Sequence, residues 1–272
     1  MQHFTLAIIL GIVQASILAD TLDTKIAIAV KAVNEDGFNW RRVMHQHPEL
    51  SFRDFRTSAL VSEHLLSLGL EVETGVAHTG VVAILRGGKP GPVIALRADM
   101  DALPVVEKTG LPYASEMKGQ YQGIEVGVMH ACGHDNHVAI LMGAAQVLTS
   151  VKDELPGTVK FIFQPAEEGP PMGENGGAKM MIEEDVLSNP KVDAIIGLHI
   201  AQLSRVGTVL YRPLGFMASA QSFDIEITGS QTHGAQPWSG IDPIVVGTQI
   251  INSLQTIVSC LLYTSPSPRD RG

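Results

Sequence analysis

The segment MHACGHDNH, Met129 to His137, carries one thiol and three imidazoles within eight residues. Thiolates and imidazoles are ligands that zinc and neighbouring divalent ions bind at neutral pH. On an extended segment, the Cys-x-His spacing would direct Cys132 and His134 to the same side. The segment therefore indicates a metal site. An inert buried thiol is the alternative for Cys132.

Two later segments, QPAEEG (164–169) and GLH (197–199), each follow a short apolar run that predicts a buried strand. Successive side chains on an extended backbone point in opposite directions, so one of Glu167 and Glu168 can bind a metal while the other faces water that is to be activated. Alone, the paired acids could be a solvated loop and His199 a core histidine. Their place at strand ends favours a functional site.

Asp99 and Asp101 follow another apolar run, in the segment RADMD. Their i, i+2 spacing is compatible with turn residues before Pro104. It is equally compatible with carboxylates that orient metal-binding imidazoles without touching the ion. Both interpretations stay open at this point.

Elements that could position these groups can be read from the hydrophobic pattern. Short runs rich in Val and Ile predict strands, and residues with helical spacing surround and separate them. Because strands and helices alternate, an α/β fold with a largely parallel central sheet is expected, with a ligand crevice at the carboxyl ends of the strands. Asp135 or Asn136 is available as the N-cap of the helix after the thiol segment. The predicted strands are 81–85, 93–98, 159–163 and 194–198, and the predicted helices are 23–33, 40–45, 53–68 (closed by Gly69), 139–148 and 178–187.

The composition indicates an ordinary globular protein that binds small molecules or peptides. The chain has 272 residues, of which 45% are hydrophobic and 17% charged, so it can form one large core or two domains. A net charge of -9 and the lack of Lys/Arg runs argue against a nucleic-acid partner. Two cysteines are too few for a disulfide framework.

The N-terminus predicts export. Residues 4–19 are apolar and almost uncharged, with small residues at the end, which is typical of a secretory signal peptide over 1–19, although Met1-Gln2-His3 lacks a Lys or Arg. The run is shorter than the ~20 apolar residues of a membrane-spanning helix, so no stable membrane insertion is expected. A secreted or periplasmic protein follows from this interpretation. A buried N-terminal helix, in a cytoplasmic protein, is the alternative.

Six segments in order resemble the amidohydrolase branch of the metallo-aminoacylase superfamily, which includes hippurate hydrolases, N-acyl-amino-acid amidohydrolases and hydrolases of auxin-amino-acid conjugates. The resemblance runs from about Trp40 to about Ser259. Each motif alone is weak, but the ordered set is specific. The segments are RADMDALP, MHACGHDNH, FQPAEEG, GGAKMMIEE, GLH and TGSQTHGAQPW.

The resemblance implies a role for each candidate residue. Glu167 would be the general base, and His233 would contact the substrate from a lid or dimerisation domain. Asp99 and Asp101 match the segment where the wider superfamily has a His-x-Asp pair. One or two divalent ions, Mn²⁺ or Zn²⁺, would be bound, and the full-length protein would be a homodimer. The implied metal ligands are Cys132, His134, Glu168 and His199.

The resemblance also implies a domain organisation. Residues 20–215 would form the N-terminal part of a zinc-peptidase-like catalytic domain, and 216–259 the start of an α+β, ferredoxin-like lid. The sequence of 260–272, CLLYTSPSPRDRG, fits neither helix nor strand and predicts a non-native tail, with a natural disordered terminus as the alternative. Because the family's last metal ligand would lie beyond Gly272, we expect these 272 residues alone to be inactive.

The mechanism implied is metal-assisted hydrolysis of the amide bond in N-acyl amino acids or similar conjugates. Neither a G-x-S-x-G elbow nor an H-E-x-x-H motif is present, which argues against a serine hydrolase and a zincin. Two alternatives stay open. One is a dipeptidase or aminopeptidase with the same metal chemistry, and the other is a metal-binding protein without turnover, against which the presence of Glu167 argues.

Overall fold

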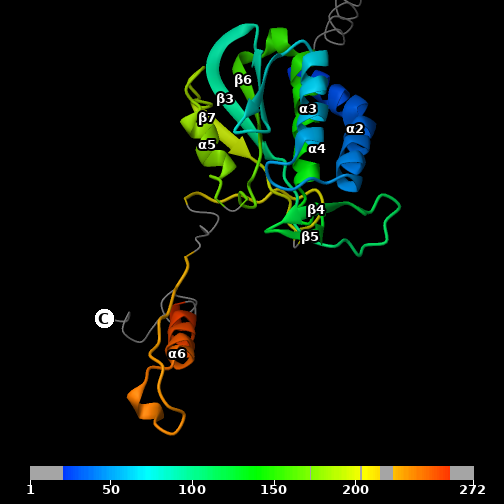
Figure 1. Cartoon of the computed structure of the whole chain (residues 1–272). Helices are drawn as coiled ribbons and strands as arrows, with labels where there is room; N and C mark the ends of the chain where they lie inside the picture. The colour runs from blue at the N-terminus through cyan, green and yellow to red at the C-terminus, as the bar shows by residue number, and fades with distance from the viewer. Residues whose placement is uncertain (1–20, 172, 203, 215–222, 258–272) are drawn as a thin grey trace, which may run out of the picture. The chain divides into compact units, whose positions relative to one another are not determined.

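The computed structural model describes residues 21–171, 173–202, 204–214 and 223–257 (Figure 1). The predicted signal peptide over 1–19 and the predicted tail over 260–272 lie outside the described residues. The chain divides into two compact units, Met1–Arg205 and Val206–Gly272, and each is described by itself.

The first unit is an α/β structure, as the alternation of strand-like and helical segments predicted. All four predicted strands are present, each within a few residues of its expected bounds. Its elements are α2 (Leu22–Gln46), α3 (Phe55–Ser67), β1 (Glu71–Val76), β2 (Gly80–Arg86), β3 (Lys89–Asp99), β4 (Lys118–Tyr121), β5 (Ile124–Gly127), α4 (His134–Ser150), η1 (Lys152–Glu154), β6 (Pro156–Gln164), α5 (Gly177–Glu183) and β7 (Ala194–Gly197).

The central sheet is mixed, with the order β1-β2-β6-β3-β7. β3 pairs in parallel with β6 and β7, but β2 pairs antiparallel with both β1 and β6. The expectation of a largely parallel sheet was therefore wrong for one half of it. The missed strand is β1, and the short turn at Ala77–Thr79 that joins it to β2 allows only antiparallel pairing. β4 and β5 form a separate antiparallel hairpin.

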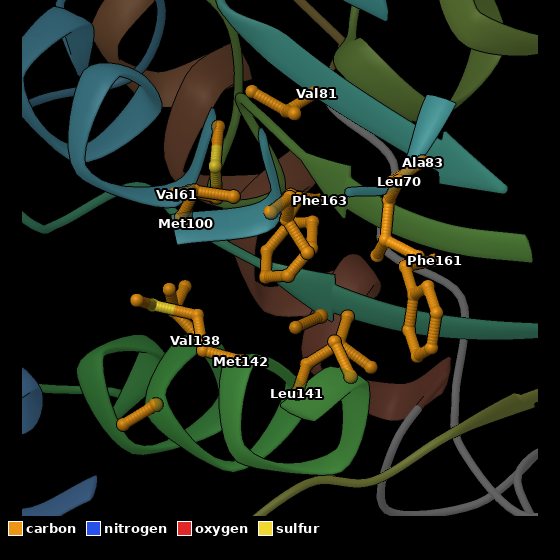
Figure 2. Packing of buried hydrophobic residues seen from close by; sticks show 14 of the residues in the cluster. Val61, Leu70, Val81, Ala83, Met100, Val138, Leu141, Met142, Phe161 and Phe163 are labelled. Carbon is orange, nitrogen blue, oxygen red and sulfur yellow. The ribbon is translucent and has the colours of Figure 1, made fainter. Parts of the chain in front are cut away.

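Both faces of the sheet are covered, because side chains alternate along each strand. Phe161 and Phe163 of β6 join the larger core beneath α3 and α4, whereas Ile162 between them joins a smaller core beneath α5. Figure 2 shows Phe161 and Phe163 facing Leu141 and Met142 of α4 across the larger core. The parallel pairing of β3 with β6 and β7 places the carboxyl ends of these three covered strands at the same edge of the sheet.

Helix boundaries follow local backbone chemistry. Gly69, with φ +75°, ends α3 as predicted, because a left-handed residue after the last turn suits glycine. α2 is one continuous helix where two shorter ones were predicted. α4 begins at His134, and its N-cap is Gly133 rather than Asp135 or Asn136, so that part of the prediction was wrong. Among the described residues, no helix combines the length and apolarity needed to cross a membrane.

The second unit contains η2 (Pro237–Ser239) and α6 (Pro243–Thr256) in its described part. The Asp242 side chain accepts a hydrogen bond from the Ile244 N–H and caps α6, and Pro243 stands at the first helical position. The alternating apolar and polar residues of 223–228 are typical of a half-exposed strand, but the structure has no strand over these residues. Just after this segment, Ser230 forms an isolated antiparallel bridge with Ile241.

Candidate metal centre

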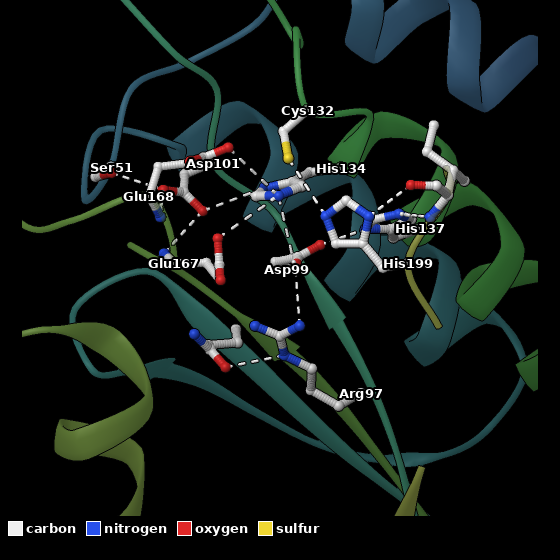
Figure 3. A network of polar contacts seen from close by, with 12 residues as sticks. Ser51, Arg97, Asp99, Asp101, Cys132, His134, His137, Glu167, Glu168 and His199 are labelled. Carbon is white, nitrogen blue, oxygen red and sulfur yellow. Dashed lines mark hydrogen bonds and ion pairs between the residues drawn. The ribbon is translucent and has the colours of Figure 1, made fainter. Parts of the chain in front are cut away.

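Four loops of the first unit meet at one edge of the sheet. Asp99 is the last residue of β3, and the segments with Glu167, Glu168 and His199 follow β6 and β7. The loop with Cys132 leads into α4 and reaches the same edge, as Figure 3 shows. Parallel strands β3, β6 and β7 end together, which brings residues distant in sequence into contact.

His134 lies at the centre of this group and is fully buried. Its Nδ1 lies 3.5 Å from Asp101 Oδ1, and its Nε2 lies 3.6 Å from Glu168 Oε1 and 3.8 Å from Glu167 Oε2. Neither ring nitrogen has a hydrogen-bond partner, and neither has Glu168 Oε1. A buried nitrogen and a buried carboxylate oxygen are costly to leave unpaired, and a divalent cation between them would satisfy both.

Cys132 and His199 complete the cluster. Cys132 Sγ lies 3.3 Å from His199 Nε2, although the two residues come from different loops. Donor atoms of Cys132, His134 and His199 lie within 4.8 Å of one another, and so do those of His134, Glu167 and Glu168. The four residues expected to be metal ligands are thus brought together, with His134 shared by two groups. This donor set fits a borderline-soft divalent ion.

The protonation of Cys132 depends on that cation. Burial, together with the nearby Glu168 carboxylate, raises the pKa of the Cys132 thiol to about 12 in the metal-free protein. The thiol is therefore neutral at pH 7 without an ion. Because only the thiolate binds metal well, metal binding must release this proton.

Asp101 holds the loop that carries the two glutamates. Its Oδ1 and Oδ2 accept hydrogen bonds from the backbone N–H groups of Glu167 and Glu168, each at 3.0 Å, and Oδ2 also accepts from Ser51 Oγ at 2.7 Å. The carboxylate is buried. Asp101 is therefore a residue that fixes the glutamate loop, and the turn interpretation does not describe it.

Asp99 is held from two sides. Its Oδ2 accepts from Arg97 Nη1 at 2.7 Å, and its Oδ1 lies 2.5 Å from His137 Nδ1. Burial by itself disfavours the charged carboxylate, but the His137 hydrogen bond and the charges of His134 and Arg97 outweigh it and hold the pKa of Asp99 at about 2. The carboxylate is ionised at neutral pH, and each of its oxygens has a hydrogen-bond partner.

The two adjacent glutamates do not point to opposite sides as expected. Both carboxylates lie within 4 Å of His134 Nε2, and the backbone bends at these two residues, directly after Ala166 with φ +50°. They differ in exposure instead: the side chain of Glu167 is 38% exposed and that of Glu168 is 20% exposed. Water reaches Glu167 more freely.

A buried ionic network holds the start of α4, directly after the loop that carries Cys132. Asp135 Oδ2 lies 2.8 Å from His45 Nδ1 and 2.9 Å from Arg41 Nε, so its carboxylate binds α2 instead of capping α4. His45 Nε2 lies 3.2 Å from Glu107 Oε1. Sequence reasoning missed this network, since nothing in the spacing of residues 45, 107 and 135 links them.

His233, predicted to contact substrate, belongs to the second unit. Its Nδ1 accepts a hydrogen bond from the Ala235 N–H at 3.1 Å, and the residue is exposed. The first unit therefore contains all the other predicted site residues but not this one.

Comparisons with known proteins agree with the resemblance of the motifs. The family model "Peptidase family M20/M25/M40" matches residues 95–253. "Thermostable carboxypeptidase 1" of Saccharolobus solfataricus is 46% identical over 80% of this chain and 53% of its own length. "N-acetyl-L-cysteine deacetylase" of Bacillus subtilis is 46% identical over 80% of this chain and 49% of its own length.

A solved structure is also similar. The crystal structure of a Bacillus subtilis protein described as a dinuclear metal-binding peptidase of the M20 family is 44% identical, with a TM-score of 0.54 over 62% of this chain and 43% of that one. The chain spans about half the length of the curated relatives it matches.

Proposed function

Because the chain belongs to peptidase family M20/M25/M40, we propose that the whole protein is a metal-dependent hydrolase that cleaves the amide bond of small N-acyl amino acids. The observation that carries the proposal is the convergence of Cys132, His134, Glu168 and His199 at one edge of the sheet, with Glu167 beside them. Two of these donors, His134 and Glu168, have buried polar atoms without partners, as an ion-binding site requires.

The ion would be held by a thiolate, two imidazoles and a carboxylate. Manganese or zinc suits this mixture of donors, and one or two ions are proposed, because the pair Cys132 and His199 and the pair Glu167 and Glu168 each form a donor group with His134. When bound, the ion supplies Lewis acidity to water and to the scissile carbonyl. The Asp101 carboxylate, which faces His134 Nδ1 at 3.5 Å, orients that imidazole.

Glu167 is the general base of the proposal. Its carboxylate lies at the edge of the donor cluster but is more exposed than that of Glu168, so it can accept a proton from water. It then delivers this proton to the amine as the carbon–nitrogen bond breaks. The hydrogen bonds from the backbone of the glutamate loop to Asp101 keep Glu167 in register with the cluster.

The substrate class rests on the relatives. Similarity to a protein named N-acetyl-L-cysteine deacetylase favours an N-acyl amino acid. Equal identity to a protein named thermostable carboxypeptidase favours a second candidate, a short peptide cleaved next to its terminal residue. Both reactions break a linear amide with the same groups.

Activity assays on the full-length protein test both candidate substrate classes. Chelation should abolish hydrolysis of N-acetyl amino acids, and Mn²⁺ or Zn²⁺ should restore it. A dipeptide series measured in parallel distinguishes the candidates by kcat/KM. Hydrolysis that persists unchanged after complete metal removal, verified by elemental analysis, would contradict the proposal.

Homodimerisation and export complete the proposal. The resemblance expects His233 to act across a dimer, and the 1–19 segment has the composition of a secretory leader. Sedimentation equilibrium on the full-length protein and N-terminal sequencing of its mature form would test them. A monomer with full activity, or a retained leader, would contradict the respective part.

A further inference from the structure

His137 is the third imidazole of the thiol segment and stands beside the proposed ligands without being one of them. It lies in the first turn of α4, three residues after His134, and is buried. Its Nδ1 lies 2.5 Å from Asp99 Oδ1, and its Nε2 lies 2.9 Å from the backbone nitrogen of Ile200. Both ring nitrogens are therefore in use.

These two contacts fix the tautomer of His137. A backbone N–H can only donate, so Nε2 must accept from Ile200 and carry no proton. The ring proton then lies on Nδ1 and is donated to Asp99. Although donor atoms of Asp99, His134 and His137 lie within 4.8 Å of one another, the Nε2 lone pair of His137 is occupied by Ile200, and His137 is not a metal ligand.

The Asp99 carboxylate is itself anchored to the sheet. Arg97 Nη1 donates to Asp99 Oδ2 at 2.7 Å, and Arg97 Nε donates to Gln164 Oε1 of β6 at 2.9 Å. Hydrogen bonds thus connect Gln164 through Arg97 and Asp99 to His137. Figure 3 shows Arg97, Asp99 and His137 of this network. Because β3 and β6 are interior strands of the sheet, Arg97 and Gln164 are held rigidly.

At its other end, this hydrogen-bonded network determines the position of His199 through Ile200. Ile200 is the next residue, and its carbonyl oxygen lies 2.6 Å from His199 Nδ1, which leaves His199 Nε2 directed at Cys132 Sγ. The Ile200 side chain packs on Gly133, where a Cβ would lie 2.2 Å from Ile200 Cδ1. The Ile200 backbone is therefore bound to α4 through His137, and its side chain packs on Gly133 of the loop that carries Cys132.

We propose that His137 is a positioning residue, which holds the Ile200 backbone so that His199 Nε2 meets the Cys132 thiolate at the metal centre. This inference rests on the proposed function only in taking Cys132, His134 and His199 as ligands. Without the His137 bond, the segment after β7 loses its link to α4, and the His199 imidazole spends less time in the ligand position. Loss of such supporting hydrogen bonds typically weakens metal binding by about 10- to 100-fold.

Titration of the metal-free chain with Co²⁺ tests the proposal without any assay of turnover. The wild type should bind Co²⁺ with thiolate-to-metal charge-transfer absorption from Cys132. His137→Ala should keep that band but bind about 10- to 100-fold more weakly, with a changed ligand-field spectrum from the displaced imidazole. His137→Gln should recover most of the affinity, because its amide oxygen can accept from Ile200 near the position of Nε2.

Two control variants separate the possible outcomes. His64→Ala removes a half-buried histidine that contacts the same helix through the Met142 carbonyl, far along α4 from the site, and should bind Co²⁺ as the wild type does. Cys132→Ser should lose the charge-transfer band. If His137→Ala binds as tightly as the wild type while Cys132→Ser binds weakly, the positioning role is overturned and the metal site stands.

Two further outcomes would also contradict the positioning role of His137. Affinity lost equally in His137→Ala and His137→Gln, with folding intact by circular dichroism, would overturn the acceptor role given to Nε2. If the wild type binds no Co²⁺, the ligand assignment fails, and the positioning inference fails with it.

Discussion

Asp54 offers a quantitative test of the structure, because a buried acid makes stability depend on pH in a direction that can be worked out. Its side chain is fully buried beneath the start of α3, where Oδ1 accepts from Thr79 Oγ1 at 2.5 Å and Oδ2 has no partner. Burial raises the pKa of Asp54 from 3.8 to about 7, although the Thr79 hydrogen bond opposes this. The folded protein therefore keeps this carboxyl protonated in mild acid.

Proton linkage gives the direction in which pH changes the free energy of unfolding. Since the folded state binds the proton more tightly than the unfolded chain, the contribution of Asp54 to stability is complete below pH 3.8 and is lost as the pH rises through about 7. A difference of about three pKa units corresponds to about 4 kcal/mol. Of this, about 1.5 kcal/mol is already lost at pH 5, and about 2.5 kcal/mol is lost between pH 5 and pH 8.5.

Asp54→Asn should remove this loss, because the amide is isosteric with the protonated acid and keeps an acceptor for Thr79. Urea denaturation of the metal-free protein, followed by circular dichroism at both pH values, measures the effect. The free energy of unfolding of the variant, relative to wild type, should improve by about 2.5 kcal/mol from pH 5 to pH 8.5. Asp153→Asn, at an exposed acid, is the control and should leave the profile unchanged. Parallel profiles for wild type and Asp54→Asn would show that burial does not raise the pKa of Asp54.

Three further predictions concern the site. Cys132→Ser should lower metal content and activity together, because a hydroxyl is a poorer ligand than a thiolate; unchanged metal by elemental analysis would make it a packing residue. His233→Ala in the full-length protein should lower kcat/KM without changing metal stoichiometry, and reduced stoichiometry would instead indicate a ligand. Asp101→Asn should lower kcat by about 10- to 100-fold, because the amide has only one acceptor oxygen in place of the two that accept from the backbone N–H groups of Glu167 and Glu168. Wild-type kcat would show that the glutamate loop keeps its conformation without these hydrogen bonds.

Much of the first unit could be predicted because its strands are apolar on both faces. Such runs indicate buried strands, and the polar residues directly after them indicate a crevice. The motifs and their places at strand ends were therefore enough to predict that Cys132, His134, Glu168 and His199 meet at one edge of the sheet. The strand β1 was missed because its sequence, EVETGV, is polar and mostly exposed at the sheet edge.

The remaining features depend on backbone turns and long-range contacts that periodicity does not encode. The backbone bends at Glu167 and Glu168 after a left-handed Ala166, and α4 begins at His134 after a left-handed Gly133. The Asp135 side chain binds α2 rather than acting as a cap, because a buried carboxylate gains more from His45 and Arg41. For Asp135, a tertiary contact overrode the local preference for helix capping.

Hydrolysis of an N-acetyl amino acid by Glu167→Gln in the full-length protein, at measured metal occupancy, tests whether Glu167 is the general base. Glutamine keeps the size of the side chain but cannot take a proton from water. The assignment of Glu167 as the general base predicts metal content equal to wild type and kcat lowered by about 10²- to 10⁴-fold. Wild-type kcat in a variant with full metal occupancy would contradict it.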